Sequence, residues 1–403
     1  MKKKIAIIGA GKLGKGYAAD LFAKAGYHPV FITRRQQQAD TLRAQGYYTV
    51  CLEHENGAPM EIYRVHDFTA WCSEGPERNQ CLQVLAEAEI AAIAIYANGF
   101  AQAAALLAEA ICLRAQRQAG TLDILLLVNS PSPDAVLDAL IREGLHTSAE
   151  IQYYEKNIGL VTTLPIRDGF AALPEVLAQD PEAICASDYP ELPVDREAFR
   201  GEIPAVEGLL PLDKMQTRIR AKLWTSNMRL GAIAGAGVHK GYTVFDDAVR
   251  DRQITAFWQA CKKEALYAIE HELGMDEEEY RLGEYKAPPL LPGVDIRPTV
   301  DVFERQLFGL KRKVSRQERF LGPALGCICH GKLPYHLAKA AALAYMFDNS
   351  EDPDSVEILS YVREHGIEAA VYRYSGLDKA QPMEALLAQL ICAHYAELSI
   401  QKY

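Results

Sequence analysis

The first pattern that could do chemistry is a glycine-rich turn following a short apolar segment. It reads Gly9-Ala10-Gly11-Lys12-Leu13-Gly14 and comes directly after residues 5–8. In such a turn Gly9 permits the tight bend, Gly11 lets the backbone approach a pyrophosphate, and Gly14 allows close packing of helix on strand. The N–H groups that open the following helix then attract the phosphates. We predict that this turn binds a dinucleotide, and that all of its residues except Ala10 contact the cofactor.

The end of the next apolar segment indicates which dinucleotide is bound. Residues 29–33 read as a second strand, and they lead into Thr33-Arg34-Arg35. Sites selective for NAD place an acid here to accept the ribose 2′-hydroxyl, whereas sites for NADP use arginine for the 2′-phosphate. Arg34 can fork onto a phosphate, Arg35 adds charge, and Thr33 can donate a hydrogen bond. We therefore expect NADP(H) to be preferred, with NAD(H) as the alternative.

A second pattern, in the other half of the chain, combines a lysine and an asparagine on one predicted helix. It runs from Lys222 through Asn227 to Leu230. On a regular helix of 3.6 residues per turn, Lys222 and Arg229 share a narrow arc and Asn227 lies well round from it. A lysine can exchange the proton of a substrate hydroxyl, and an asparagine amide can stabilise an oxyanion. The same residues would also suit a solvated helix face.

Elements of two different kinds position these patterns. Strand and helix segments alternate in the first half, with strands at 5–8, 29–33, 90–96 and 123–128, and this alternation predicts a doubly wound parallel sheet. Long helical patterns dominate after about residue 200. The predicted fold is therefore an α/β Rossmann dinucleotide-binding domain over residues 1–200, followed by a mostly α-helical substrate and catalytic domain over residues 201–403.

Composition excludes several classes of protein. With a net charge of −10 over 403 residues, the chain is not expected to bind nucleic acid or an anionic membrane. No apolar run approaches the length of a membrane span, and the apolar stretch near the start is too short for a signal peptide. Nine scattered cysteines indicate reduced thiols and give no zinc spacing. We expect a cytoplasmic protein without a metal site, either a monomer or a homo-oligomer.

The segment 222–254 resembles the polyol-specific long-chain dehydrogenases, in particular the mannitol-1-phosphate 5-dehydrogenase-like members of that family. The family carries Lys-x-x-x-x-Asn-x-x-His, then a glycine-rich segment and a T-x-x-D-A run. The residues that match without a gap are Lys222, Asn227, Gly237, Gly241, Asp247 and Ala248. The glycine-rich turn also resembles the family's G-A-G-N-I-G-R-G. Length and domain order agree over nearly the whole chain.

The resemblance implies roles for three residues. Lys222 would be the general acid–base of a hydride-transfer reaction between an alcohol and a carbonyl. Asn227 would donate a hydrogen bond to the oxyanion. Asn129, which follows the predicted strand 123–128, matches a family asparagine close to the nicotinamide and the substrate.

Several departures from the family pattern fall among the implied substrate contacts. The family histidine is Leu230 here, an Asp-Arg pair is Thr162-Thr163, an Asn-Pro pair is Arg297-Pro298, and an arginine falls near Phe308. These changes suggest a different substrate from the family's own. Three residues could compensate and are expected to bind a small-molecule substrate that carries a carboxylate or phosphate: Arg229, Arg297 and His239.

The preferred hypothesis is an NADPH-dependent reductase of a polyol-, sugar- or keto-acid-type carbonyl. One alternative is an enzyme of the same fold that reduces an imine or another functional group. A second alternative is a nucleotide-sensing protein without activity, in which Leu230 marks the loss of the histidine.

Overall fold

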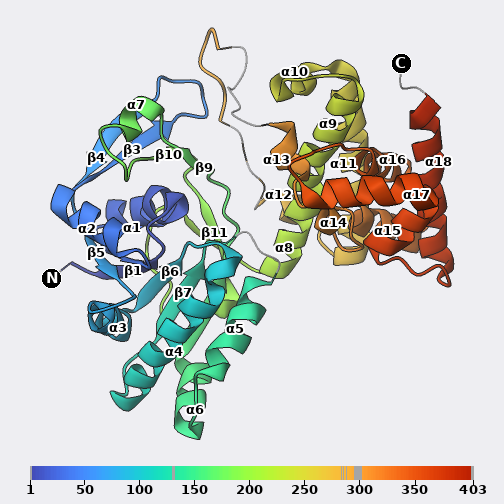
Figure 1. Cartoon of the computed structure of the whole chain (residues 1–403). Coiled ribbons are helices and arrows are strands. Elements are labelled where there is room, and N and C mark those ends of the chain that lie inside the picture. Colours follow the sequence, from blue (N-terminus) through green and yellow to red (C-terminus); the bar gives the residue numbers. More distant parts are fainter. Residues whose placement is uncertain are drawn as a thin grey trace. The chain divides into compact units, whose positions relative to one another are not determined.

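The computed structural model describes residues 2–128, 132–282, 284, 286, 288–294 and 302–400. The chain forms two compact units, coloured by sequence in Figure 1. The first unit contains Met1–Gln216 and Tyr285–Arg297, and the second contains Thr217–Glu284 and Pro298–Tyr403. The predicted boundary between residues 200 and 201 assumes two consecutive segments, whereas the first compact unit also takes in residues 285–297 from far along the chain.

The first unit is built on a six-stranded sheet with strand order β5-β2-β1-β6-β7-β8, in which all neighbours are parallel. The strands are β1 (Lys4–Ile8), β2 (His28–Thr33), β5 (Thr69–Cys72), β6 (Ile90–Ile93), β7 (Leu122–Leu126) and β8 (Ile158–Thr162). Strands buried on both faces have no need for polar alternation, which explains their continuous apolar runs. The predicted parallel α/β architecture is confirmed.

One face of this sheet is covered by four helices, which pack on one another as well as on the strands (Figure 1). They are α3 (Arg78–Glu87), α4 (Phe100–Gln116), α5 (Pro133–Glu143) and α6 (Ser148–Asn157). The opposite face is covered by the first helix of the chain. That helix contains a π-helical turn, η1 (Gly14–Ala18), followed by α1 (Ala19–Lys24). Tyr17 and Phe22 on it are fully buried in the same cluster as Ile5 and Ile7.

A second sheet, which the sequence patterns did not predict, covers the outer side of this first helix. Its strand order is β4-β3-β10-β9. The strands are β3 (Tyr48–Glu53), β4 (Glu61–Val65), β9 (Gly169–Ala171) and β10 (Ile184–Ser187). A short parallel pair, β11 (Leu192–Asp195) and β12 (Leu209–Leu212), also occupies the region where strands were expected to end. These strands were missed because they are short and because paired strands lie far apart in the chain, as Val50 of β3 and Ile184 of β10 do, so no local periodicity marks them.

Arg167, just before β9, ties the first helix to this second layer. Its guanidinium is buried and donates to the carbonyl oxygen of Gly16 at 2.7 Å and to a carboxylate oxygen of Asp20 at 2.6 Å. It also lies 4.8 Å from the centroid of the Tyr17 ring. The helix is therefore held on one side by apolar packing and on the other by the buried guanidinium of Arg167.

Arg114 of α4 holds the other helical layer to the sheet. It is 2% exposed, and its nitrogens donate to the Tyr153 hydroxyl and to five backbone carbonyl oxygens at 2.7–3.1 Å. The carbonyls belong to Leu85, Ala86, Ala88, Gly120 and Thr121. These groups lie at the end of α3 and just before β7. One side chain thus donates to three buried and two partly buried carbonyls at the entry to two central strands.

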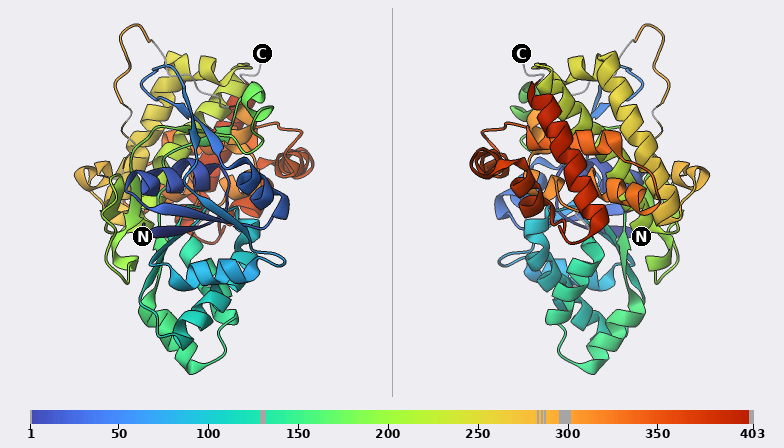
Figure 2. Two further views of the ribbon diagram at one scale, coloured as in Figure 1. Left: turned by 90° about the vertical axis from the view of Figure 1, so that its left-hand side faces the viewer. Right: turned by 90° about the vertical axis from the view of Figure 1, so that its right-hand side faces the viewer.

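The second unit is helical in its described part. Its longer helices are α9 (Met228–His239), α11 (Arg252–Leu273), α16 (Tyr335–Tyr345), α17 (Pro353–Ser375, with a non-helical kink at Gly366) and α18 (Pro382–Ile400). Its shorter helices are α8 (Met215–Lys222), α10 (Phe245–Arg250), α12 (Glu277–Arg281), α13 (Phe303–Leu307), α14 (Leu310–Lys313) and α15 (Leu321–Cys329). Figure 2 shows α18, in red, running beside the other carboxyl-terminal helices, and α15, α16 and α18 share one apolar cluster.

Within the second unit, the carboxylate of Glu264 on α11 closes the start of α16. It is buried and accepts hydrogen bonds from the backbone N–H groups of His336 and Leu337 at 2.9–3.1 Å. A carboxylate at a helix amino end satisfies N–H groups that have no partner within the helix. The predicted mostly α-helical second half is confirmed.

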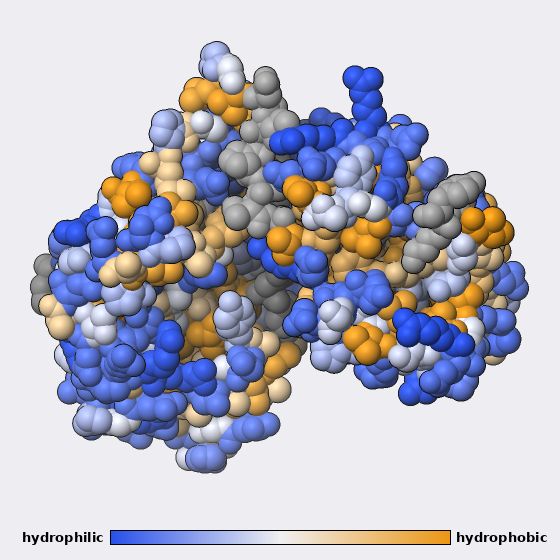
Figure 3. All heavy atoms as spheres, turned by 45° about the horizontal axis from the view of Figure 1, so that its top comes forward, coloured by the Kyte–Doolittle hydropathy of each residue, from blue (hydrophilic) through white to orange (hydrophobic). Residues whose placement is uncertain are grey.

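None of the helices in the described part of the chain is long and apolar enough to cross a membrane. On the face seen in Figure 3, hydrophilic residues cover most of the surface and apolar residues occur in small separate groups.

Replacing Arg114 should weaken the fold. In Arg114→Ala, three buried carbonyl oxygens at the end of α3 lose this donor, and we expect the free energy of unfolding to fall by about 3–5 kcal/mol. Arg117→Ala is the matched control, because its exposed guanidinium contacts Gln83 and should change stability by about 0.5 kcal/mol or less. Urea unfolding followed by circular dichroism measures both. Equal midpoints for the two variants would contradict the role given to Arg114.

Candidate functional site

The glycine-rich turn follows β1 and has no room for side chains at two of its glycines. Gly9 has a φ of +110°, and a Cβ atom there would overlap the carbonyl oxygen of Ala94. A Cβ on Gly14 would overlap the carbonyl oxygen of Gly9. Gly11 differs, because nothing lies within 4 Å of the position where its Cβ would stand. The turn therefore leaves an open approach to the backbone at Gly11, which is where a pyrophosphate is expected to come close.

A fourth glycine, Gly16, takes part in this arrangement and was not singled out from the sequence. A Cβ on it would lie 2.8 Å from Ile184 and 2.9 Å from Ala186, both on β10. The repeat of glycine at positions 9, 11, 14 and 16 was the available signal, although its meaning depends on the unpredicted second sheet. Of the two remaining turn residues, Lys12 is exposed and Leu13 is half-buried.

The end of β2 presents Arg34 and Arg35 to solvent, as the cofactor hypothesis requires. Thr33 is different. It is 6% exposed, and its hydroxyl donates to Gln38 Oε1 at 2.7 Å. The Arg35 guanidinium donates to the same oxygen at 3.3 Å. Thr33 is thus engaged with Gln38 on α2 (Gln36–Gln45), so its contribution to a cofactor site is to hold the residues around it.

Beneath the turn lies a buried ion pair that the sequence analysis missed. Lys15 on the π-helical turn η1 donates to a carboxylate oxygen of Glu182 at 2.9 Å, and the two side chains are 3% and 13% exposed. Burial lowers the pKa of Lys15, and the Glu182 carboxylate partly opposes that shift. Since Glu182 lies 167 residues away in sequence, no local motif could reveal the pair.

In the second unit, the Lys222 segment is not a regular α-helix, and that expectation is wrong. A π-helical turn, η4 (Leu223–Asn227), is inserted between α8 and α9. Its signature is the bond from the N–H of Met228 to the carbonyl of Leu223, five residues earlier. A π turn holds more residues than an α turn, and such turns recur at functional sites.

This turn changes which side chains share a face of the helix. Residues five apart are stacked in a π turn, so Asn227 comes onto the face of Lys222, from which a regular helix would separate it by about 140°. The extra residue also places Leu230 about 20° from Lys222 and Arg229 about 120° from it. With the π turn, the three named positions of the spacing Lys-x-x-x-x-Asn-x-x-His lie on one face of the helix. This explains why the three residues stand at this spacing.

The positions of Arg229 and Leu230 follow from this rotation. Arg229 is exposed, and its guanidinium lies 4.9 Å from the centroid of the Trp258 ring on α11. The expected common face for Lys222 and Arg229 is thus wrong. Leu230 is half-buried and packs against the helical core. The position of the family histidine therefore holds an apolar side chain that also has apolar neighbours.

A segment just before α15 braces the π turn. The guanidinium of Arg319 is 6% exposed and donates to the carbonyl oxygen of Asn227 at 3.2 Å and to the carboxylate of Glu318 at 3.2 Å. The indole of Trp224 donates to the carbonyl oxygen of Gln317 at 3.3 Å. A Cβ on Gly231 would lie 2.7 Å from the Phe320 ring, so glycine at this position lets the segment that contains Arg319 and Phe320 approach the helix.

Two other histidines of the helical unit are paired with carboxylates. His330 has a ring nitrogen 3.1 Å from the Glu272 carboxylate, and His336 has one 2.8 Å from Glu264. His239 is the half-buried last residue of α9. Two predicted site residues, Asn129 and Arg297, fall outside the described residues. In the described part of the chain no group of three or more His, Cys, Asp or Glu side chains is arranged to hold a metal.

The three basic residues of α14, Lys311, Arg312 and Lys313, are engaged with carboxylates or backbone carbonyls. The Lys311 ammonium lies 2.5 Å from Glu357, and Arg312 lies 2.6 Å from Glu318. Lys313 is buried, and its ammonium donates to the carbonyl oxygens of Arg305 and Gln306 at 3.2 and 2.8 Å. Burial, followed by the repulsion of Arg319 and Arg312, lowers the pKa of Lys313 to about 7.

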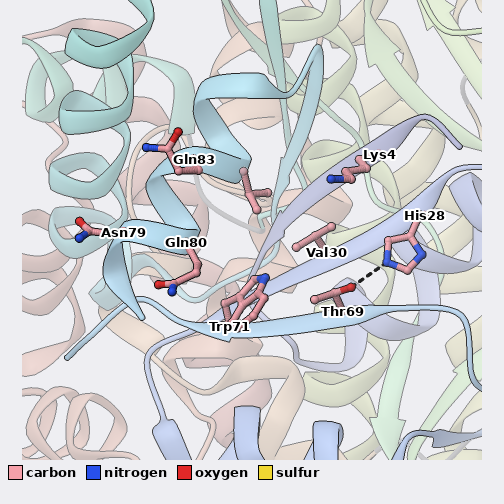
Figure 4. A pocket seen from close by; sticks show the side chains of 9 residues that line it. Lys4, His28, Val30, Thr69, Trp71, Asn79, Gln80 and Gln83 are labelled. Atoms are coloured by element: carbon pink, nitrogen blue, oxygen red, sulfur yellow. Dashed lines mark hydrogen bonds between the residues drawn. The ribbon is translucent and has the colours of Figure 1, made fainter. Parts of the chain in front are cut away.

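A cavity of about 450 Å³ in the first unit lies away from the glycine-rich turn (Figure 4). It is lined by the first residues of three parallel strands, Lys4, His28 and Thr69, and by α3. The ring of His28 bonds to the Thr69 hydroxyl at 2.8 Å on its rim. Since the turn follows the carboxyl end of β1, this cavity is at the opposite edge of the sheet and plays no part in the cofactor hypothesis.

The pKa of Lys313 makes a testable contribution to stability. A lysine with a lowered pKa binds fewer protons when folded than when unfolded, so between about pH 7 and its ordinary 10.5 its contribution to stability rises with pH. Lys313→Met lacks this term. Its stability relative to the unaltered protein should therefore be higher at pH 6 than at pH 9.5, by about 3 kcal/mol. Lys379→Met, at an exposed site, is the control for urea unfolding at both pH values. A pH-independent difference for Lys313→Met would contradict this account.

Comparisons with known proteins agree with the fold. Residues 3–208 match the model of the mannitol dehydrogenase Rossmann domain. The chain is 24% identical to mannitol-1-phosphate 5-dehydrogenase of Geobacillus stearothermophilus over 93% of its own length and 95% of the relative's. It is 26% identical to the Brevibacillus brevis protein of that name, over 94% and 95% of the two chains.

Two solved structures share the fold of the whole chain at low sequence identity. A D-sorbitol dehydrogenase in substrate-free form matches with a TM-score of 0.74 at 13% identity, covering 100% of this chain and 94% of that one. Mannitol 2-dehydrogenase of Pseudomonas fluorescens, in a complex with NAD and D-mannitol, matches with a TM-score of 0.69 at 14% identity, covering 100% and 93%. By the match to its family model and the length over which its relatives align, the chain belongs to the mannitol dehydrogenase family.

Proposed function

We propose that this protein is an NADP(H)-preferring oxidoreductase that interconverts a sugar-alcohol-type hydroxyl and its carbonyl. Its relatives are dehydrogenases of this type, and family membership supports an NAD(P)-dependent enzyme acting on CH–OH groups. The observation that carries the proposal is the π turn Leu223–Asn227, which brings Lys222 and Asn227 onto one helix face. A regular helix would give this pair no common target.

The residues at the glycine-rich turn fit a dinucleotide. The open space at Gly11, between two glycines that tolerate no side chain, is a cradle that a single Cβ would fill. The proposed cofactor contacts are Gly9, Gly11, Lys12, Leu13, Gly14, Arg34 and Arg35, with Thr33 acting through Gln38 and with Asn129 outside the described residues. NADP(H), when bound, supplies or accepts the hydride.

The chemistry left to the protein is proton transfer and charge stabilisation. Lys222 donates a proton to the carbonyl oxygen during reduction and takes it back during oxidation. Asn227 donates an amide hydrogen bond to the same oxygen as negative charge develops on it. Arg319 positions Asn227, because its guanidinium holds the Asn227 carbonyl at the end of the π turn. Leu230 supplies no polar contact here, so the substrate oxygen depends on Lys222 and Asn227.

An anionic group on the substrate remains part of the proposal, with Arg229, Arg297 and His239 as its contacts. The rotation of Arg229 off the face of Lys222 means that it would meet a part of the substrate away from the reacting carbon. A comparison of kcat/KM for a polyol and its phosphate ester tests this group, and a preference for the neutral compound would contradict it.

Removing the proposed acid–base tests the reaction. Lys222→Ala should lower kcat by about 10²–10⁴-fold, since proton transfer is lost, while the Kd for NADPH stays within about threefold. Arg220→Ala on the same helix is the matched control and should leave both values unchanged. Oxidation of NADPH with a panel of sugar and keto-acid carbonyls is the measurement.

The other outcomes of that assay are informative. Full activity in Lys222→Ala would refute the assignment of Lys222. Turnover of the unaltered protein that requires an added amine would identify an imine reductase of the same fold. Tight NADPH binding with no turnover on any compound would identify a sensor, for which the apolar Leu230 would then be the reason.

Titration by nicotinamide fluorescence tests the cofactor. The unaltered protein should bind NADPH at least about tenfold more tightly than NADH, because Arg34 and Arg35 can pair with the 2′-phosphate. Arg34→Ala should lose most of that preference. Gly11→Ala should weaken both cofactors without loss of stability, since its Cβ meets only open space. Gly120→Ala, at an equally open position away from the turn, is the control. Equal Kd values for NADPH and NADH in the unaltered protein would remove the role of Arg34.

A further inference from the structure

The sequence has no acidic residue at the end of β2, but the fold brings the carboxylate of Glu182 close to it. Glu182 lies just before β10 of the second sheet, and its carboxylate accepts a hydrogen bond from Gln38 Nε2 at 2.7 Å. Gln38 in turn accepts from the Thr33 hydroxyl at 2.7 Å. One amide side chain therefore joins Glu182 to the position where enzymes selective for NAD carry their acid.

The same amide reaches both proposed parts of the cofactor site. Gln38 Nε2 also donates to the carbonyl oxygen of Ala10 in the glycine-rich turn at 3.2 Å. Its Oε1 accepts from the Arg35 guanidinium at 3.3 Å. Since Gln38 is 7% exposed and all these contacts are made at once, its orientation is fixed. Glu182 holds the donor end of the amide, and the acceptor end is thereby turned toward Arg35.

Lys15 balances the charge of Glu182. Its ammonium donates to a carboxylate oxygen of Glu182 at 2.9 Å and to the backbone carbonyl of the same residue at 2.5 Å. Both side chains are largely removed from water, so their interaction is screened far less than that of a surface pair. With the carboxylate neutralised, the exposed Arg34 and Arg35 dominate the field at the end of β2.

We propose that Lys15 determines cofactor specificity by neutralising Glu182 beside the 2′-phosphate position. This inference rests on the proposed preference for NADP(H). Without the ammonium, the Glu182 carboxylate would present uncompensated negative charge next to Gln38 and Arg35. It would then repel a 2′-phosphate as a β2 acid does, while leaving a 2′-hydroxyl acceptable. Lys15 acts through Glu182 and Gln38 and is a positioning and charge-balancing residue.

Three variants test the proposal by titration with NADPH and with NADH at pH 8. Lys15→Met should raise the Kd for NADPH at least about tenfold and the Kd for NADH less than about threefold, because only NADPH carries the phosphate. The double variant Lys15→Met/Glu182→Gln removes both charges and should return the NADPH Kd to within about threefold of the unaltered value. Glu182→Gln alone should bind NADPH at least as tightly as the unaltered protein.

These outcomes separate the inference from the function on which it rests. An unaltered protein with equal affinities for NADPH and NADH would refute the proposed cofactor preference. A clear preference for NADPH that Lys15→Met leaves intact, or a loss that the double variant does not rescue, would overturn the role of Lys15 alone. If Lys15→Met does not fold, as judged by circular dichroism, Glu182→Gln decides the question, since weaker NADPH binding in that variant contradicts the proposal.

Discussion

The first unit depends on how closely the first helix lies against the layers on either side of it. Gly9 and Gly14 touch where β1 turns into this helix, and Gly16 meets β10 of the second sheet with no space for a Cβ. Any side chain at these points would push the helix away from one layer. The direction of the N–H groups at the helix start, and hence the proposed phosphate site, is set by this packing. Arg167 then fixes the outer side of the helix through Gly16 and Asp20.

In the helical unit, the positions of the proposed catalytic residues depend on a change in the winding of one helix. The π turn Leu223–Asn227 rotates everything that follows it, so that Lys222 and Asn227 face the same way. Such a turn is less favourable than α-helix and persists where its surroundings support it. Arg319 supplies that support at the carbonyl of Asn227, and Gly231 makes room for it. The arrangement of Lys222 and Asn227 thus depends both on the π turn and on the hydrogen bond from Arg319 that supports it.

Both candidate sites contain buried charged side chains, and the role of these side chains is to position neighbouring groups. A buried ion pair costs much of its attraction in lost hydration, and apolar replacements are often as stable. Lys15 with Glu182 and Arg319 with Glu318 are therefore poor explanations of stability. They fix the direction of hydrogen bonds to Gln38 and to the Asn227 carbonyl, which apolar side chains could not do. Arg114 differs, since it satisfies backbone carbonyls that would otherwise be buried without a donor.

The sequence by itself determined the parallel sheet, the glycine-rich turn, the helical second half and the family, because apolar runs and glycine spacing are local patterns. It also located Lys222 and Asn227, but not their common face, since a π turn leaves no periodic signal. Only the tertiary structure decided the second sheet, the role of Gly16 and the arrival of Glu182 beside Gln38 and Lys15. These depend on contacts between residues more than a hundred positions apart. No acidic residue follows β2 in the sequence. The fold brings Glu182, paired with Lys15, to this place from a distant part of the chain.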